Sequence, residues 1–81
     1  MKYTNKNREF EKEIIKYVAN FINVKKDKLN LNSKIDDFIT WDSIAHVNLI
    51  LSLEKKYKVK IVAEDYFKLK SIKKILKFLE K

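Results

Sequence analysis

With 81 residues, the chain has room for one small hydrophobic core, so we expect residues 1–81 to form a single domain. The absence of cysteine excludes disulfides and thiolate metal sites, and the single histidine argues against a histidine-based metal site. The formal net charge of +8 raises the question of acidic partners, but Arg8 is the only arginine, and lysines also occur as solvated faces.

No apolar run approaches the roughly 20 residues that a membrane-spanning helix needs, and the first residues lack the apolar segment of a signal peptide. We therefore expect a cytoplasmic protein without stable membrane insertion. The chain also contains no glycine and no proline, the residues that open tight hairpins. This composition favours an all-α fold in which polar loops join the helices.

Residues 5–22 are predicted to form the first helix, because apolar side chains recur there at helical spacing. These side chains are Phe10, Ile14, Val18, Phe21 and Ile22. Residues 23–40 carry isolated apolar side chains among Asn, Asp, Ser and Lys, which predicts a long ordered loop with one helical turn starting near Asp27.

A second helix is predicted over residues 43–57, with Asp42 as its N-cap. One apolar arc of this helix is wide enough to face a core, and it consists of Leu49, Ile50, Leu53 and Tyr57. A second arc lies beside it and consists of Ile44, Val47 and Leu51. Either both arcs are buried between several helices, or the second arc is an exposed docking surface, which its position next to Ser43 favours.

The last part of the chain is predicted to contain a short and a longer helix. We expect residues 59–62 to form an extended link, because a single strand would have no pairing partner. A short third helix is predicted to open at residues 63–65, and a final amphipathic helix over residues 71–81 has Ser71 as its N-cap.

Ser43 stands at the start of the second predicted helix, where N–H groups and the helix dipole stabilise an anion. A phosphodiester on its hydroxyl would be favoured there, although Asp-Ser at a helix start is also ordinary capping. His46 follows three residues later. Without a third orienting group or an oxyanion hole, this pair does not support a hydrolase, and we expect His46 to be half-buried near Ser43.

The sequence around Ser43 contains an extended motif. Asp37-Phe38 precedes Asp-Ser-Ile at residues 42–44, and a regular series follows: Val47, Leu49, Ile50, Leu53, Glu54, Tyr57, Val59 and Ile61. In this register, residues 36–61 resemble the acyl carrier protein family, whose modified serine opens the second of four helices. The resemblance covers essentially the whole chain. It implies a four-helix bundle with three longer helices, a short third helix and a long loop between the first two.

The resemblance also implies a function. Ser43 would receive 4'-phosphopantetheine from coenzyme A in a Mg²⁺-dependent reaction of a separate phosphopantetheinyl transferase, which Asp42 helps to engage. The terminal thiol would then carry acyl groups as thioesters between loading and transferring enzymes. The protein is thus expected to be a monomeric, non-catalytic carrier.

The resemblance assigns further residues to partners and cargo. Partner contacts are expected at Ile44, Val47, Leu51 and Glu54, and an interior acyl cavity is expected to be lined by Phe38, Ile50, Leu53, Ile61 and Leu69. The aromatic side chains of Tyr66 and Phe67 are expected to narrow that cavity, so a long-chain cargo is not predicted.

Two features depart from the family pattern. The glycine common before Asp-Ser is absent, and positions that carry carboxylates in fatty-acid carriers hold Ala45, Asn48, Lys55 and Lys56. The charge change favours a specialised pathway with dedicated partners over bulk fatty-acid synthesis. The alternative function is a small basic helical nucleic-acid-binding protein, although lysine contacts alone would bind without sequence specificity.

Overall fold

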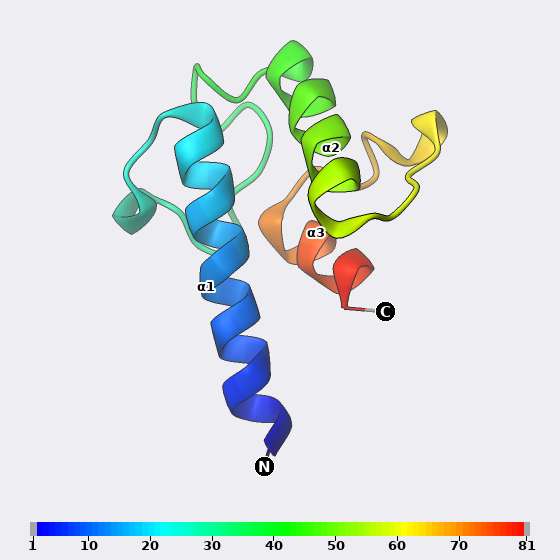
Figure 1. The fold of residues 1–81 in the computed structure, drawn as a ribbon. Helices are drawn as coiled ribbons and strands as arrows, with labels where there is room; N and C mark the ends of the chain where they lie inside the picture. Colours follow the sequence, from blue (N-terminus) through cyan, green and yellow to red (C-terminus); the bar gives the residue numbers. More distant parts are fainter. Residues whose placement is uncertain (1, 81) are drawn as a thin grey trace.

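The computed structural model describes the backbone of residues 2–80 and the side chains of residues 8–80. Its elements are α1 (Lys2–Ile22), η1 (Lys26–Lys28), α2 (Ser43–Tyr57), η2 (Ala63–Asp65) and α3 (Ile72–Leu79), shown in Figure 1. Over residues 2–80 the regular structure is helical, which confirms the all-α prediction. The four-helix detail is not confirmed, because the expected short third helix is only the 3₁₀ turn η2.

The helix α1 begins at Lys2, three residues earlier than predicted, and buries Ile14, Val18 and Ile22. Phe21, which was expected in the buried stripe, is 38% exposed and stacks on the Tyr17 ring instead. The helix ends where Asn23 takes φ 59° and the N–H of Val24 donates to the Ala19 carbonyl at 2.9 Å. This is a left-handed C-terminal cap in which asparagine takes the place that glycine usually has.

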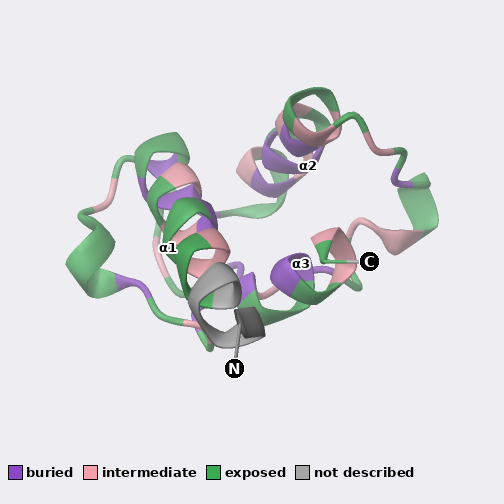
Figure 2. Ribbon diagram, turned by 60° about the horizontal axis from the view of Figure 1, so that its bottom comes forward, coloured by how far each residue is buried: buried purple, intermediate pink, exposed green. Residues whose placement is uncertain are grey.

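The core lies where α1 meets α2 and α3, and the buried faces of these helices turn toward one another in Figure 2. Its largest fully buried side chain is Trp41, which belongs to the loop and not to a helix. Leu29 and Ile35 of the same loop are also buried. The buried apolar residues of the long connection thus hold it against the helices, which confirms that the predicted loop is ordered.

Backbone hydrogen bonds also fasten the long loop to the start of α3. The N–H of Ile35 donates to the Lys70 carbonyl at 2.9 Å, and the N–H of Ile72 donates to the Ser33 carbonyl at 3.0 Å. The N–H of Lys73 donates to the Leu31 carbonyl at 3.0 Å. These bonds join residues far apart in sequence, so the loop is ordered by the last helix.

Residues 59–62, between α2 and η2, form neither helix nor strand, and Val62 is extended at φ −71° and ψ 149°. Lys58 takes the left-handed conformation at φ 54° and ends α2, and the N–H of Val59 donates to the Glu54 carbonyl at 3.2 Å. Ile61 and Leu69 are buried and hold the segment against the core. Ser71 caps α3 by accepting the N–H of Lys74 on its Oγ at 3.2 Å.

Candidate functional site

Ser43 is the first residue of α2, and its side chain is exposed. Asp42 precedes it in an extended conformation, and its Oδ1 accepts the N–H of Ala45 at 2.9 Å. This is the predicted N-cap. The cap fixes the first turn of the helix and leaves the serine hydroxyl on its solvent side, at the positive end of the helix dipole.

The loop that enters the serine turns without glycine. Asp36 adopts φ 74°, and its N–H donates to the Trp41 carbonyl at 2.7 Å, which closes residues 36–41 into a compact turn. Asp37 accepts the backbone N–H of Lys34 at 3.0 Å and forms an ion pair with the Lys34 Nζ at 3.1 Å. The backbone hydrogen bond from Lys34, strengthened by its ammonium, lowers the pKa of Asp37. The turn thus carries a fixed carboxylate six residues before Ser43.

Behind Ser43 lies a buried polar network that the sequence did not predict. The indole Nε1 of Trp41 donates to the Nδ1 of His46 at 3.1 Å, and both side chains have no exposed surface. An indole N–H can only donate, so Nδ1 is an acceptor and the imidazole proton lies on Nε2. Nε2 then donates to the Tyr66 carbonyl at 2.9 Å. His46 therefore joins three parts of the chain: the loop of residues 36–42 that precedes Ser43 (the serine loop), α2, and the segment after η2.

The burial of His46 corrects the expectation of a half-buried side chain. Its ring also lies 5.7 Å from the Phe67 ring, centroid to centroid, and 6.1 Å from the Trp41 ring. Burial lowers the pKa of His46, and the backbone hydrogen bond at Tyr66 only partly opposes this effect. The imidazole is therefore neutral near pH 7 and serves as a structural connector.

The two apolar arcs of α2 have different environments. Leu49, Ile50 and Leu53 have no exposed surface and belong to the core. In the second arc, Ile44 is 75% exposed, Leu51 is 43% exposed and Val47 is half-buried. The structure thus selects the exposed arc over the alternative in which both arcs are buried.

Sequence reasoning missed the exposed apolar side chains of Ile39 in the loop before Ser43 and of Val62 after α2. Phe67, which was expected to narrow an interior cavity, is instead 46% exposed. Ile39 is 97% exposed and lies four residues before Ser43. A lone apolar residue inside a polar loop gives no periodic signal, so its exposure is known only from the structure.

Tyr57 and Glu54 both serve the fold. Tyr57 donates its hydroxyl to Glu13 of α1, and its ring meets Phe10 edge to face at 5.7 Å. Burial, followed by the hydrogen bond to Glu13, raises the pKa of Tyr57. Glu54, predicted to contact partners, accepts the N–H of Ile61 on Oε2 at 2.6 Å. One oxygen of that carboxylate is therefore already used to hold the extended segment.

The residues expected to line an acyl cavity do come together. Ile50, Leu53, Ile61 and Leu69 are buried in one cluster, and Phe38 packs against it. They are the packed core between α2 and the segment that follows it. A chain entering there would have to displace side chains that are already in contact.

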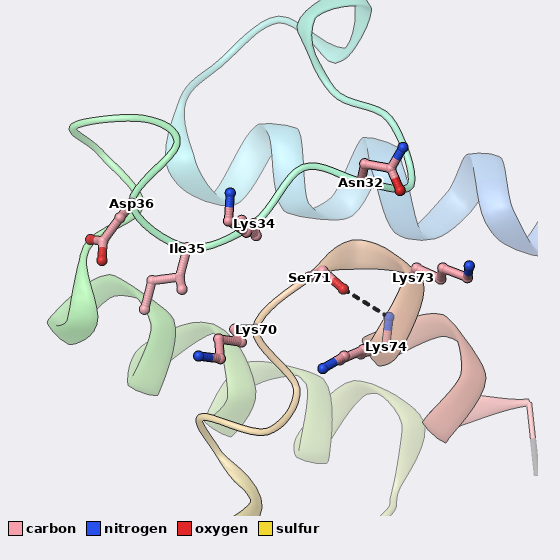
Figure 3. Close-up of a pocket in the computed structure, with 8 residues that line it drawn as sticks. All are labelled: Asn32, Lys34, Ile35, Asp36, Lys70, Ser71, Lys73 and Lys74. Carbon is pink, nitrogen blue, oxygen red and sulfur yellow. Dashed lines mark hydrogen bonds between the residues drawn. The ribbon is translucent and has the colours of Figure 1, made fainter.

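A basic hollow of about 430 Å³ lies between the loop and the start of α3, shown in Figure 3. Lys34, Lys70, Lys73 and Lys74 contribute its positive charge. The first N–H groups of α3 already donate to Leu31, Ser33 and Ser71. Lysine side chains and the Asn32 amide are left to meet an anion here, and Lys34 is already paired with Asp37, which favours weak, salt-sensitive contacts over a shaped phosphate site.

Two negative findings hold for residues 2–80. No group of three or more His, Cys, Asp or Glu side chains is placed to hold a metal ion. Within the same residues, none of the helices combines the length and apolar character that a membrane span requires.

Comparison with known proteins assigns the family. The model of the phosphopantetheine attachment site family matches residues 12–79. The chain is 38% identical over 69 residues to an acyl carrier protein of Brachyspira hyodysenteriae, covering 84% of this chain and 88% of the relative. Acyl carrier proteins of Campylobacter lari (31% over 68 residues; 84% and 88%) and Buchnera aphidicola subsp. Schizaphis graminum (30% over 69; 85% and 87%) are also similar. The chain therefore belongs to the acyl carrier protein family, whose cofactor is 4'-phosphopantetheine.

Proposed function

We propose that the protein carries acyl groups as thioesters on a 4'-phosphopantetheine arm attached to Ser43. The observation that carries this proposal is an exposed serine hydroxyl at the first residue of a capped helix, inside the matched attachment-site family. The Asp42 cap fixes the backbone on which the hydroxyl is presented. Asp42 is also the nearest carboxylate for engagement by the transferase.

The residues around Ser43 fit a phosphodiester. The N-terminus of α2 favours negative charge, and the solvent side of the turn leaves room for an arm. In the modification, Ser43 Oγ forms a bond to the phosphorus of coenzyme A that bears the pantetheine. The pyrophosphate bond breaks, adenosine 3',5'-bisphosphate leaves, and the hydroxyl proton passes to a base of the transferase or to water. The arm supplies the thiol that a chain without cysteine lacks.

We propose that partners dock on the exposed arc of Ile44, Val47 and Leu51, next to Ser43. Apolar side chains that remain exposed beside a modification site form a natural contact for enzymes that must reach the arm. Ala45, Asn48, Lys55 and Lys56 offer no carboxylates around this arc, and one oxygen of Glu54 is engaged by Ile61. The surface therefore attracts basic enzymes poorly, which supports dedicated partners in a specialised pathway. In this proposal the carrier acts as a monomer.

Mass spectrometry tests the attachment. The intact protein is incubated with coenzyme A, Mg²⁺ and a broad-specificity phosphopantetheinyl transferase, and we expect addition of one phosphopantetheine to wild type and none to Ser43→Ala. Ser52→Ala is the matched control, because Ser52 lies on the same helix and hydrogen-bonds Tyr17, and we expect it to be modified. Modification of Ser43→Ala, or no addition to wild type under conditions that modify a control carrier, refutes the assignment.

Enzyme assays test the pathway. A standard fatty-acid ketosynthase is offered the acylated protein and, in parallel, an acidic carrier loaded with the same acyl group. We expect the ketosynthase to turn over this protein more slowly than the acidic carrier. When Lys55 and Lys56 are both replaced by Glu, the turnover rate should rise toward that of the acidic carrier. Efficient turnover of the unmodified sequence contradicts the specialised assignment.

A further inference from the structure

We propose that this carrier keeps short or polar acyl groups outside the protein and does not shelter long aliphatic chains in its core. The reason is that His46 is hydrogen-bonded across the two contacts that α2 makes beside Ser43, one with the serine loop and one with the segment after η2. The inference rests on the proposed attachment at Ser43. It concerns what the arm can do after attachment, so the two can be tested separately.

The imidazole of His46 lies directly behind the attachment site. His46 lies three residues after Ser43 on α2, about one turn deeper in the protein. At this end α2 meets the serine loop through Trp41 and the segment after η2 through Tyr66. An acyl chain tethered to Ser43 reaches the core most directly between α2 and one of these two segments. The imidazole is hydrogen-bonded to both segments.

Aromatic and apolar side chains fill the space behind Ser43. Trp41 and His46 have no exposed surface, and the ring of Phe67 lies 5.7 Å from the imidazole. Leu49, Ile50 and Leu53 continue the packing with no exposed surface. The path to the cavity expected from the family resemblance is thus occupied by an aromatic and polar cluster.

Opening this cluster to an acyl chain costs free energy. An entering chain must break the Trp41–His46 or the His46–Tyr66 hydrogen bond and leave a buried polar group without a partner. Such a group is costly to bury, because water cannot replace the lost bond. A short or polar acyl group gains little from burial and has no reason to enter. The closed state is therefore the stable one for such a cargo.

Methyl and indole NMR tests this directly. The transferase is used to load acetyl- and octanoyl-phosphopantetheine from the corresponding acyl coenzymes A, and mass spectrometry confirms each product. We expect the methyl resonances of Leu53, Ile61 and Leu69, and the indole N–H resonance of Trp41, to be the same in both forms. Chain-length-dependent shifts of these core signals in wild type overturn the proposal.

Two variants show whether His46 is the closure. In His46→Ala we expect the octanoyl form, but not the acetyl form, to shift the core methyl signals. His46→Gln keeps a donor and an acceptor and is expected to stay closed. Unchanged core signals in a folded, octanoyl-loaded His46→Ala assign closure elsewhere and overturn the role of His46. If His46→Ala does not fold, His46→Ser, which also removes the ring but keeps a hydroxyl for one of the two hydrogen bonds, replaces it with the same criterion.

Failure of the two proposals is distinguishable. No mass addition at Ser43 refutes the attachment and removes the basis of this inference. Mass addition followed by burial of the octanoyl chain refutes only the inference about cargo.

Discussion

Trp41→Phe is the most informative single substitution, because it removes the donor of the Trp41–His46 hydrogen bond while keeping an aromatic ring. The His46 Nδ1 would then be buried without a partner, which costs about 1–3 kcal/mol. The smaller ring also leaves unfilled volume at a site with no exposed surface, for about 1 kcal/mol more. Since 81 residues correspond to roughly 4–12 kcal/mol of total stability, we expect the loss of about 2–4 kcal/mol to be large.

A double-mutant cycle isolates the hydrogen bond from the packing loss. His46→Leu leaves the Trp41 indole N–H and the Tyr66 carbonyl unpaired and is expected to cost a similar amount. In the double variant the donor and the acceptor of the Trp41–His46 hydrogen bond are both gone. Its loss of unfolding free energy should therefore be about 1–2 kcal/mol smaller than the sum of the losses in the two single variants. Urea unfolding followed by far-UV circular dichroism measures this, since Trp41→Phe removes the only tryptophan fluorophore.

The control pair combines His46→Leu with Ile75→Val, a core change in α3 that involves no polar partner. The losses of unfolding free energy in these two single variants should sum to that of their double variant within about 0.5 kcal/mol. If Trp41→Phe and His46→Leu also add within that margin, the two side chains are not energetically coupled, and the assignment of the network as a connector is wrong.

Three further predictions follow from individual groups. Burial holds the pKa of His46 below 6.5, so the unfolded chain binds the proton first as pH falls below about 6.5. The free energy of unfolding should therefore fall by at most about 1.4 kcal/mol per pH unit until the pKa of the folded state is passed. In urea titrations, His46→Gln should lose this pH dependence. Lys58→Gly should raise the free energy of unfolding by about 1 kcal/mol, because lysine is strained in the left-handed cap of α2, whereas Asn23→Gly at the cap of α1 should change it less; equal effects would contradict this. Ser71→Ala should lower the melting temperature through loss of about 1 kcal/mol of N-cap energy, with exposed Lys73→Ala as a neutral control, and no difference between the two would show that the cap is not stabilising.

The parts of the fold that sequence predicts well have periodic or local signals. The bounds of α2, the Asp42 cap and the Ser71 cap each depend on a few neighbouring residues, and the structure agrees with all three. The exposed arc with Ile44 could be proposed because two arcs exceed what one small helix buries. Such features are encoded within a turn or two of helix.

The parts that sequence did not predict depend on distant contacts. The role of Trp41 and His46 requires the Tyr66 carbonyl, twenty residues beyond the imidazole, and no spacing rule within α2 indicates it. A tryptophan and a histidine that lie five residues apart across a helix start are the only local sign. The length of α1 and the reduction of the third helix to η2 were also beyond local pattern, because marginal helical turns are decided by tertiary packing.

The hydrogen bonds between the long loop and the start of α3 have a consequence for the order of events in the cell. Ile35, Ile72 and Lys73 take part in backbone bonds between segments more than thirty residues apart, so the loop cannot acquire its final shape before residues 70–73 have been synthesised. When α2 has left the ribosome but residues 70–73 have not, Ser43 would be exposed next to a loop that has not yet folded. If Ser43 is the attachment site proposed above, a transferase that requires the folded loop would meet its substrate only after residues 70–73 have been synthesised.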